Sequence, residues 1–109
     1  MTDTLKVLFQ TDPSAATLTN AYTVPASTSA VLSTIVVANR SATATSFRLS
    51  IGVAGLGDNN CQYIAYDVTI AGNAVHTFTL GISLAATDVV RVYATLATLS
   101  FSGFGVEVT

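Results

Sequence analysis

The chain has 109 residues, of which 50% are hydrophobic and only 9% are charged, and its formal net charge is −2. This length predicts one domain over residues 1–109, because single cores usually run to about 100–150 residues. The weak negative charge argues against binding to nucleic acid or to an anionic membrane, and one cysteine excludes an internal disulfide.

No targeting or membrane segment is expected. The start lacks the basic and long apolar regions of a secretory signal, so we expect the protein to be made and folded in a host cytoplasm. The purest apolar run, residues 35–38, is much shorter than the about 20 residues that a membrane span requires.

The residue types favour β-structure. The chain has a single Glu and a single Lys, which are the residues that normally cover helix surfaces, and it is instead rich in Thr, Ser, Val and Ala. Short extended patterns alternate with turn signals along its whole length. We predict strands near residues 5–10, 21–24, 31–39, 46–53, 61–70, 75–80, 89–95 and 99–108.

Details of these patterns add predictions about burial and bending. Residues 31–39 are apolar on both faces, which predicts a central strand, and Pro25 closes the strand before it. Gly81 begins a predicted linker, and Gly103 and Gly105 favour a bulge in the last strand.

Two strands show strict alternation. In the fourth predicted strand, one face is apolar and the other is expected to face solvent. In the fifth, every second residue is expected to share a face. The predicted apolar face of the fourth is Phe47, Leu49, Ile51 and Val53, opposite Ser46, Arg48, Ser50 and Gly52; the shared face of the fifth is Gln62, Ile64, Tyr66, Val68 and Ile70.

About eight short strands without a repeat or linker predict an all-β fold. Two packed antiparallel sheets, forming a β-sandwich with jelly-roll or immunoglobulin-like Greek-key connections, accommodate them best.

Few residues suggest catalysis. His76 is the only histidine and could activate Cys61, but the surroundings of Cys61 match no cysteine-enzyme signature. A packed or half-exposed histidine and a cysteine acting as a small apolar residue are the favoured interpretation. The loop of residues 55–60 lacks the Lys of a phosphate loop, and Asp58 is its only carboxylate, so it is not expected to bind phosphate or calcium.

The acidic residues also favour structural roles. Asp67 lies within a predicted strand, where Arg91 or Arg48 would be its cross-strand partner. A glycosidase would require two carboxylates about 5–10 Å apart in a groove, and no sequence pattern predicts such a pair. The six acids are Asp3, Asp12, Asp58, Asp67, Asp88 and Glu107. We therefore predict no catalytic, cofactor-binding or metal-binding residues and no cofactor.

Aromatic residues offer a second kind of site. Exposed rings could form a sugar-stacking surface, although strand aromatics are mostly packing residues and tryptophan is absent. The candidates are Tyr22, Tyr63, Tyr66, Tyr93, Phe101 and Phe104.

The scarcity of charge indicates association. Monomeric domains usually carry roughly 25–35% charged residues on the surface and protect their edge strands with charge, especially Lys. This chain has 4 basic and 6 acidic residues, so an assembly subunit fits it better than a freely diffusing enzyme.

Several segments resemble small structural proteins of tailed bacteriophages. They are residues 18–30 (LTNAYTVPASTSA), 33–40 (STIVVANR) followed by 45–48 (TSFR), 84–94 (LAATDVVRVYA) and 101–108 (FSGFGVEV). The resemblance covers most of the chain and implies a β-sandwich component of the virion, without catalytic or metal residues. The matching positions have scaffold roles, since Asn39 and Arg40 would form a turn and Asp88 would start a strand.

The leading hypothesis is a non-enzymatic virion subunit that forms a symmetric multimer in the tail, baseplate or fibre-attachment region. Its partners would be other virion proteins and copies of itself, with no nucleic acid or membrane, and its interface residues are not identified. The alternatives are a cement or decoration protein of the capsid head, a receptor- or glycan-binding module at the tail tip that binds a host surface glycan, and a small hydrolase that uses His76 or a carboxylate pair.

Overall fold

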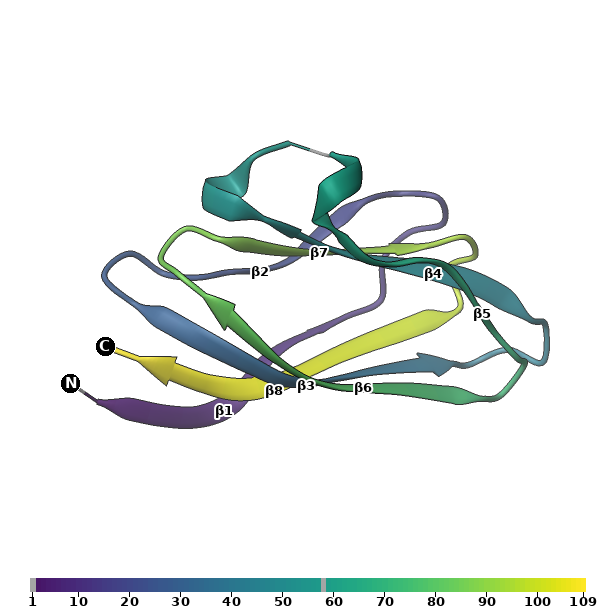
Figure 1. Cartoon of the computed structure of the whole chain (residues 1–109). Helices are drawn as coiled ribbons and strands as arrows, with labels where there is room; N and C mark the ends of the chain where they lie inside the picture. The colour runs from purple at the N-terminus through teal and green to yellow at the C-terminus, as the bar shows by residue number, and fades with distance from the viewer. Residues whose placement is uncertain (1, 58) are drawn as a thin grey trace.

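Eight strands form two antiparallel sheets that face each other in a computed structural model, which describes residues 2–57 and 59–109 (Figure 1). The predicted all-β sandwich is confirmed. The strands are β1 (Asp3–Thr11), β2 (Thr19–Thr23), β3 (Ser29–Asn39), β4 (Thr45–Gly52), β5 (Tyr63–Ile70), β6 (Val75–Leu84), β7 (Val89–Ala94) and β8 (Leu99–Val108), and the short 3-10 helices η1 (Val53–Gly55) and η2 (Asn60–Gln62) lie between β4 and β5.

The strand order distinguishes the two predicted topologies. One sheet has the order β1-β8-β3-β6 and the other β2-β7-β4-β5. The first strand therefore pairs with the last, the second with the seventh, the third with the sixth and the fourth with the fifth, as in a long hairpin wrapped over two sheets. This is the jelly-roll arrangement of eight strands.

Side chains from both sheets meet around Phe47. Its ring centroid lies 5.9 Å from that of Phe78 and 6.1 Å from that of Phe101, both in edge-to-face geometry. Such aromatic pairs contribute about 0.5–1.5 kcal/mol beyond the burial of their surface. Phe47 and Phe101 are fully buried, so the core is continuous between the sheets.

The central strand β3 lies between β8 and β6, as its apolar pattern predicts, and β2 ends before Pro25. The linker predicted to run from Gly81 through residues 85–88 is wrong in where it begins, since only residues 85–88 lie between β6 and β7. β6 continues to Leu84, and Leu80 and Gly81 form a bulge, because the register moves from Thr34 opposite Thr79 to Leu32 opposite Ile82.

The glycines of β8 do not bulge, contrary to the prediction, and the irregularities lie in its neighbours β1 and β3. Gly103 leaves room for the ring of Phe9, since a Cβ there would lie 2.2 Å from Phe9 Cε1. Gly105 similarly leaves room for the carbonyl oxygen of Val31, 1.9 Å from the position of a Cβ. These glycines therefore permit close packing beside the bulges.

Candidate functional site

A group of aromatic and charged side chains lies on the outer face of the β2-β7-β4-β5 sheet. The guanidinium carbon of Arg48 is 4.2 Å from the ring centroid of Tyr66 and 4.4 Å from that of Tyr93, and the rings of Tyr63 and Tyr66 meet edge to face at 5.0 Å. Asp67 accepts a hydrogen bond of 2.7 Å from Arg48 Nε. We call these five residues the tyrosine platform.

A bulge in β5 creates this arrangement. Asp67 has φ 51°, and the pairing moves from Phe47 opposite Val68 to Leu49 opposite Ala65, so Tyr66 and Asp67 together face Arg48. The predicted alternation through β5 is therefore wrong. Ile70 is buried at its end, whereas Tyr66 is 56% exposed. Of the two predicted partners for Asp67, Arg48 is the one that donates a hydrogen bond to it.

Several interactions of the platform converge on Arg48. Its hydrogen bond to Asp67 raises the pKa of the guanidinium above the usual value, so it remains charged. Each cation–π contact at an exposed site contributes about 0.5–1 kcal/mol. The side chain thus stays between the two tyrosine rings.

Arg91 instead holds the segment with η1 and η2 over the same sheet. It donates to Asn20 Oδ1 at 2.9 Å, to the Leu56 carbonyl at 2.7 Å and to the Gly55 carbonyl at 3.1 Å. The segment lies above the sheet in Figure 1. It covers Ser50 and Gly52, which are buried although the alternation predicts that they face water.

Three further residues fix this segment. The carboxylate of Asp88 accepts hydrogen bonds of 2.9 Å from the backbone of Ala54 and of Ala85, in agreement with its predicted position at the start of a strand. Asn59 and Gln62 form a capping box at η2. Val53, predicted to face the core, is exposed in η1 because β4 ends at Gly52.

A hollow of about 500 Å³ lies beside the platform, and its described lining residues are Asn60, Tyr63 and Tyr66. Two aromatic rings and an amide are a typical combination for a small-ligand site, and such sites measure about 300–1,000 Å³. A second hollow, of about 300 Å³, is lined by ends of β1 and β8 and by Asp12. It lacks the convergence of rings found at the first.

Two of the other aromatic candidates, Tyr22 and Phe101, have structural roles. Tyr22 donates a hydrogen bond to Glu107, which also accepts from Lys6 at 3.1 Å. Burial, followed by the hydrogen bond to Glu107, raises the pKa of Tyr22, and the Tyr22 and Lys6 contacts lower the pKa of Glu107. Phe101 belongs to the core.

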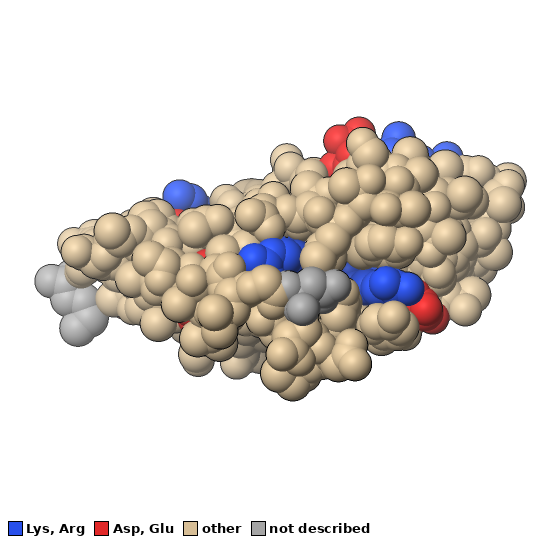
Figure 2. Space-filling model, turned by 90° about the horizontal axis from the view of Figure 1, so that it is seen from above, with Lys and Arg blue, Asp and Glu red and all other residues tan. Residues whose placement is uncertain are grey.

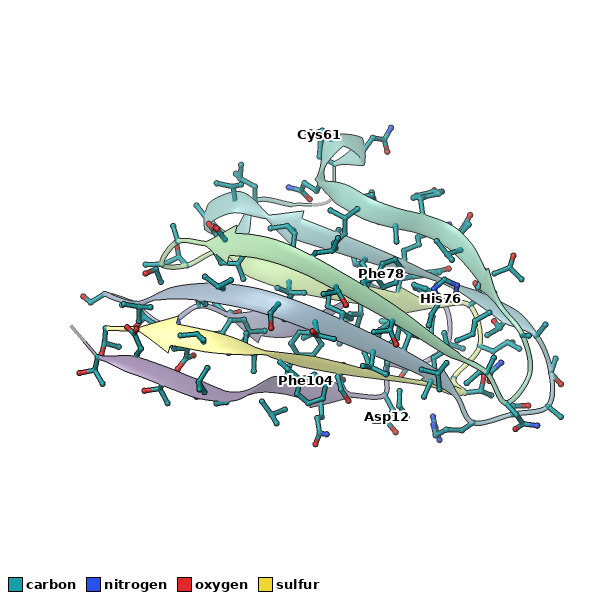
Figure 3. All side chains as sticks on the ribbon, turned by 60° about the horizontal axis from the view of Figure 1, so that its bottom comes forward. Asp12, Cys61, His76, Phe78 and Phe104 are labelled. Carbon is teal, nitrogen blue, oxygen red and sulfur yellow. The ribbon has the colours of Figure 1, made fainter. Side chains whose placement is uncertain are left out.

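Cys61 and His76 do not form a pair. Cys61 is exposed in η2, whereas the ring of His76 packs between the sheets, 5.7 Å from Phe47 and 5.5 Å from Phe78 (Figure 3). Asp58 is outside the described residues. Among the residues that are described, no three His, Cys, Asp or Glu side chains gather as a metal site would require, and no helix is long and apolar enough to span a membrane.

The outer face of the β1-β8-β3-β6 sheet has a different character. Its central side chains are apolar or hydroxyl-bearing, and Leu5, Val7 and Val31 are 82%, 48% and 39% exposed. Rows of paired residues cross the sheet, with Val106 between Leu5 and Val31 and Phe104 between Val7 and Thr34. We call Leu5, Val7, Val31, Thr34, Val36, Phe104 and Val106 the apolar face.

Comparison with known proteins returns no family and no curated protein that the chain matches.

Proposed function

We propose that this protein is a non-enzymatic structural subunit of a tailed-phage particle that associates with copies of itself through the apolar face. The observation that carries the proposal is the distribution of charge. Most charged side chains of the described residues bind partners within the subunit, and none lies in the middle of the apolar face. Those with internal partners are Lys6, Arg40, Arg48, Asp67, Asp88, Arg91 and Glu107.

The side of the molecule that carries the β2-β7-β4-β5 sheet is also sparsely charged. Figure 2 shows this side as mostly tan, with the blue and red atoms of charged residues in a few small groups. Because most charged side chains are paired within the subunit, little unpaired charge remains to repel a second copy of the protein.

The sheet that carries the apolar face approaches the size of a standard interface. Four strands spaced about 4.8 Å apart, with about ten residues of 3.3 Å each, give a surface of roughly 19 by 33 Å before side-chain relief is added. A standard interface buries about 800 Å² on each partner. An uncharged face of this kind is complementary to itself, which suits the symmetric contact of a homo-oligomer.

The edge strand β6 extends the same surface. Its ten residues, VHTFTLGISL, include no Lys, Arg, Asp or Glu, and among the described strands it pairs with β3 alone. The bulge at Leu80 and Gly81 interrupts this edge, but the uncharged residues 75–79 before the bulge still offer a strand for another chain to pair with. β6 is thus a natural place for a neighbouring virion protein to add a strand, whether in the tail or on the head.

Quantitative mass spectrometry of purified particles of the virus that encodes the chain tests this function. We expect a fixed number of copies per particle, well above one, that survives washing at high salt. Absence of the chain from particles in infected cells that express it would overturn the proposal.

A further inference from the structure

We infer that the hollow beside the tyrosine platform is a binding site for a neutral carbohydrate. Tyr63 and Tyr66 line it with Asn60, so two aromatic residues and one residue with an amide side chain border the same hollow. Tyr66 is the most exposed aromatic side chain of the platform, so its ring is accessible to a ligand.

The geometry favours a sugar because two requirements are met in one place. The C–H face of a pyranose packs against an aromatic ring, and its hydroxyls need donors and acceptors nearby. The perpendicular rings of Tyr63 and Tyr66, 5.0 Å apart between centroids, form a corner rather than a flat surface. A ring-shaped ligand can therefore contact one tyrosine with its face and the other with its edge, while the Asn60 amide meets its hydroxyls.

The local charges favour a neutral ligand. Arg48 is the only cation of the platform, and Asp67 neutralises it through contacts of 2.7 Å and 3.4 Å. The described lining residues of the hollow carry no charge. A phosphate, sulfate or sialic acid would thus find no free cation in the platform, and single-stranded nucleic acid requires the positive groove that this protein lacks.

The site is prepared before the ligand arrives. The guanidinium of Arg48 lies over the ring of Tyr66 and over that of Tyr93, and the capping box of Asn59 and Gln62 fixes η2, which carries Asn60. Little conformational freedom remains to be lost on binding, which favours affinity. The platform and the apolar face belong to different sheets, so a copy attached through one sheet still exposes the other.

A glycan array tests the inference, using neutral oligosaccharides built from glucose, galactose, mannose and N-acetylglucosamine, alongside sialylated and sulfated ones. The strongest neutral ligand is then titrated by NMR against the wild type and three variants. We expect Tyr66→Ala to weaken binding at least tenfold. Tyr66→Phe should stay within about threefold, because the stacking ring remains. Ile64→Ala, which removes an exposed apolar side chain from the same strand, should bind like the wild type.

Three results would overturn the inference. They are no binding of any neutral oligosaccharide at millimolar concentration, binding confined to charged glycans, and equal binding by Tyr66→Ala and the wild type. Thermal unfolding of each variant verifies its fold. Because the array does not depend on the oligomeric state, its failure leaves the proposed self-association unaffected.

Discussion

Arg91 is expected to be the main attachment of the segment that carries η1 and η2. Its side chain is 9% exposed and donates three hydrogen bonds, two of them to the carbonyls of Leu56 and Gly55. Replacing it by Met keeps the aliphatic stem and removes all the donors. Hydrogen bonds to charged groups contribute about 1.5–3 kcal/mol each, but the loop carbonyls regain water when the segment opens.

We therefore expect Arg91→Met to lower the free energy of unfolding by about 3 kcal/mol. For a domain of this size such a loss corresponds to a fall of about 12–24 °C in melting temperature. The matched control is Arg40→Met, because Arg40 is exposed and its described side-chain hydrogen bond is one of 3.2 Å to the Ala97 carbonyl. That variant should stay within about 0.5 kcal/mol of the wild type.

Urea unfolding measures both variants, and amide hydrogen exchange of Ala54 and Leu56 reports on the segment itself. Both amides are hydrogen-bonded in the folded protein. In Arg91→Met the amides of Ala54 and Leu56 should exchange faster than in the wild type, with a larger increase than for the amides of the core strands. A loss below about 1 kcal/mol for Arg91→Met, or a loss equal to that of Arg40→Met, would refute this reasoning.

Two further predictions concern packing and pH. Gly103→Ala should lower the free energy of unfolding by about 1–3 kcal/mol, because its Cβ would meet the Phe9 ring, and the loss should be smaller in a Phe9→Leu background. Gly81→Ala should leave the free energy of unfolding unchanged, because no atom lies within 4 Å of the position of its Cβ. Equal effects of the two glycine variants in urea unfolding would contradict this prediction. Tyr22→Phe should cost about 1 kcal/mol at pH 7, and the difference should shrink as the pH falls well below 4.5. The sign follows because the pKa of Glu107 is lower in the folded protein than in the unfolded chain. The ionised carboxylate therefore stabilises the fold fully at a pH above its unfolded pKa, and this stability is lost as the pH falls through the folded pKa. A constant difference from pH 7 to pH 3 would refute the second prediction.

Local patterns were sufficient to predict the strands but not their pairing. Residues 31–39 are apolar on both faces, and such a run indicates a central strand whatever its neighbours are. The choice between jelly roll and Greek key depends on contacts such as β1 with β8, which join opposite ends of the chain. Alternation within one strand carries no information about those contacts.

The candidate site was harder to predict because it depends on one irregular residue. The sequence offered Arg91 or Arg48 as a partner for Asp67, and it offered Tyr66 as one of six aromatic candidates for a sugar-stacking surface. It did not predict the stacking of Arg48 on Tyr66. The apolar residues of β5 alternate without interruption through Val68, so the sequence pattern gives no sign of the bulge at Asp67. A non-glycine residue with positive φ leaves little trace in a sequence, although Asp adopts this conformation more readily than most residues.

The central claim is self-association through the apolar face, and light scattering of the purified protein at several concentrations and two salt levels tests it most directly. The account predicts a defined oligomer that persists on dilution and at high salt. Val31→Lys, which places a charge in the row that Val31 forms with Val106 and Leu5, should shift the mass to that of the monomer, whereas Thr69→Lys on the other sheet should not. A wild-type monomer at tens of micromolar under both salt conditions, or an oligomer that Val31→Lys leaves intact, would contradict the account.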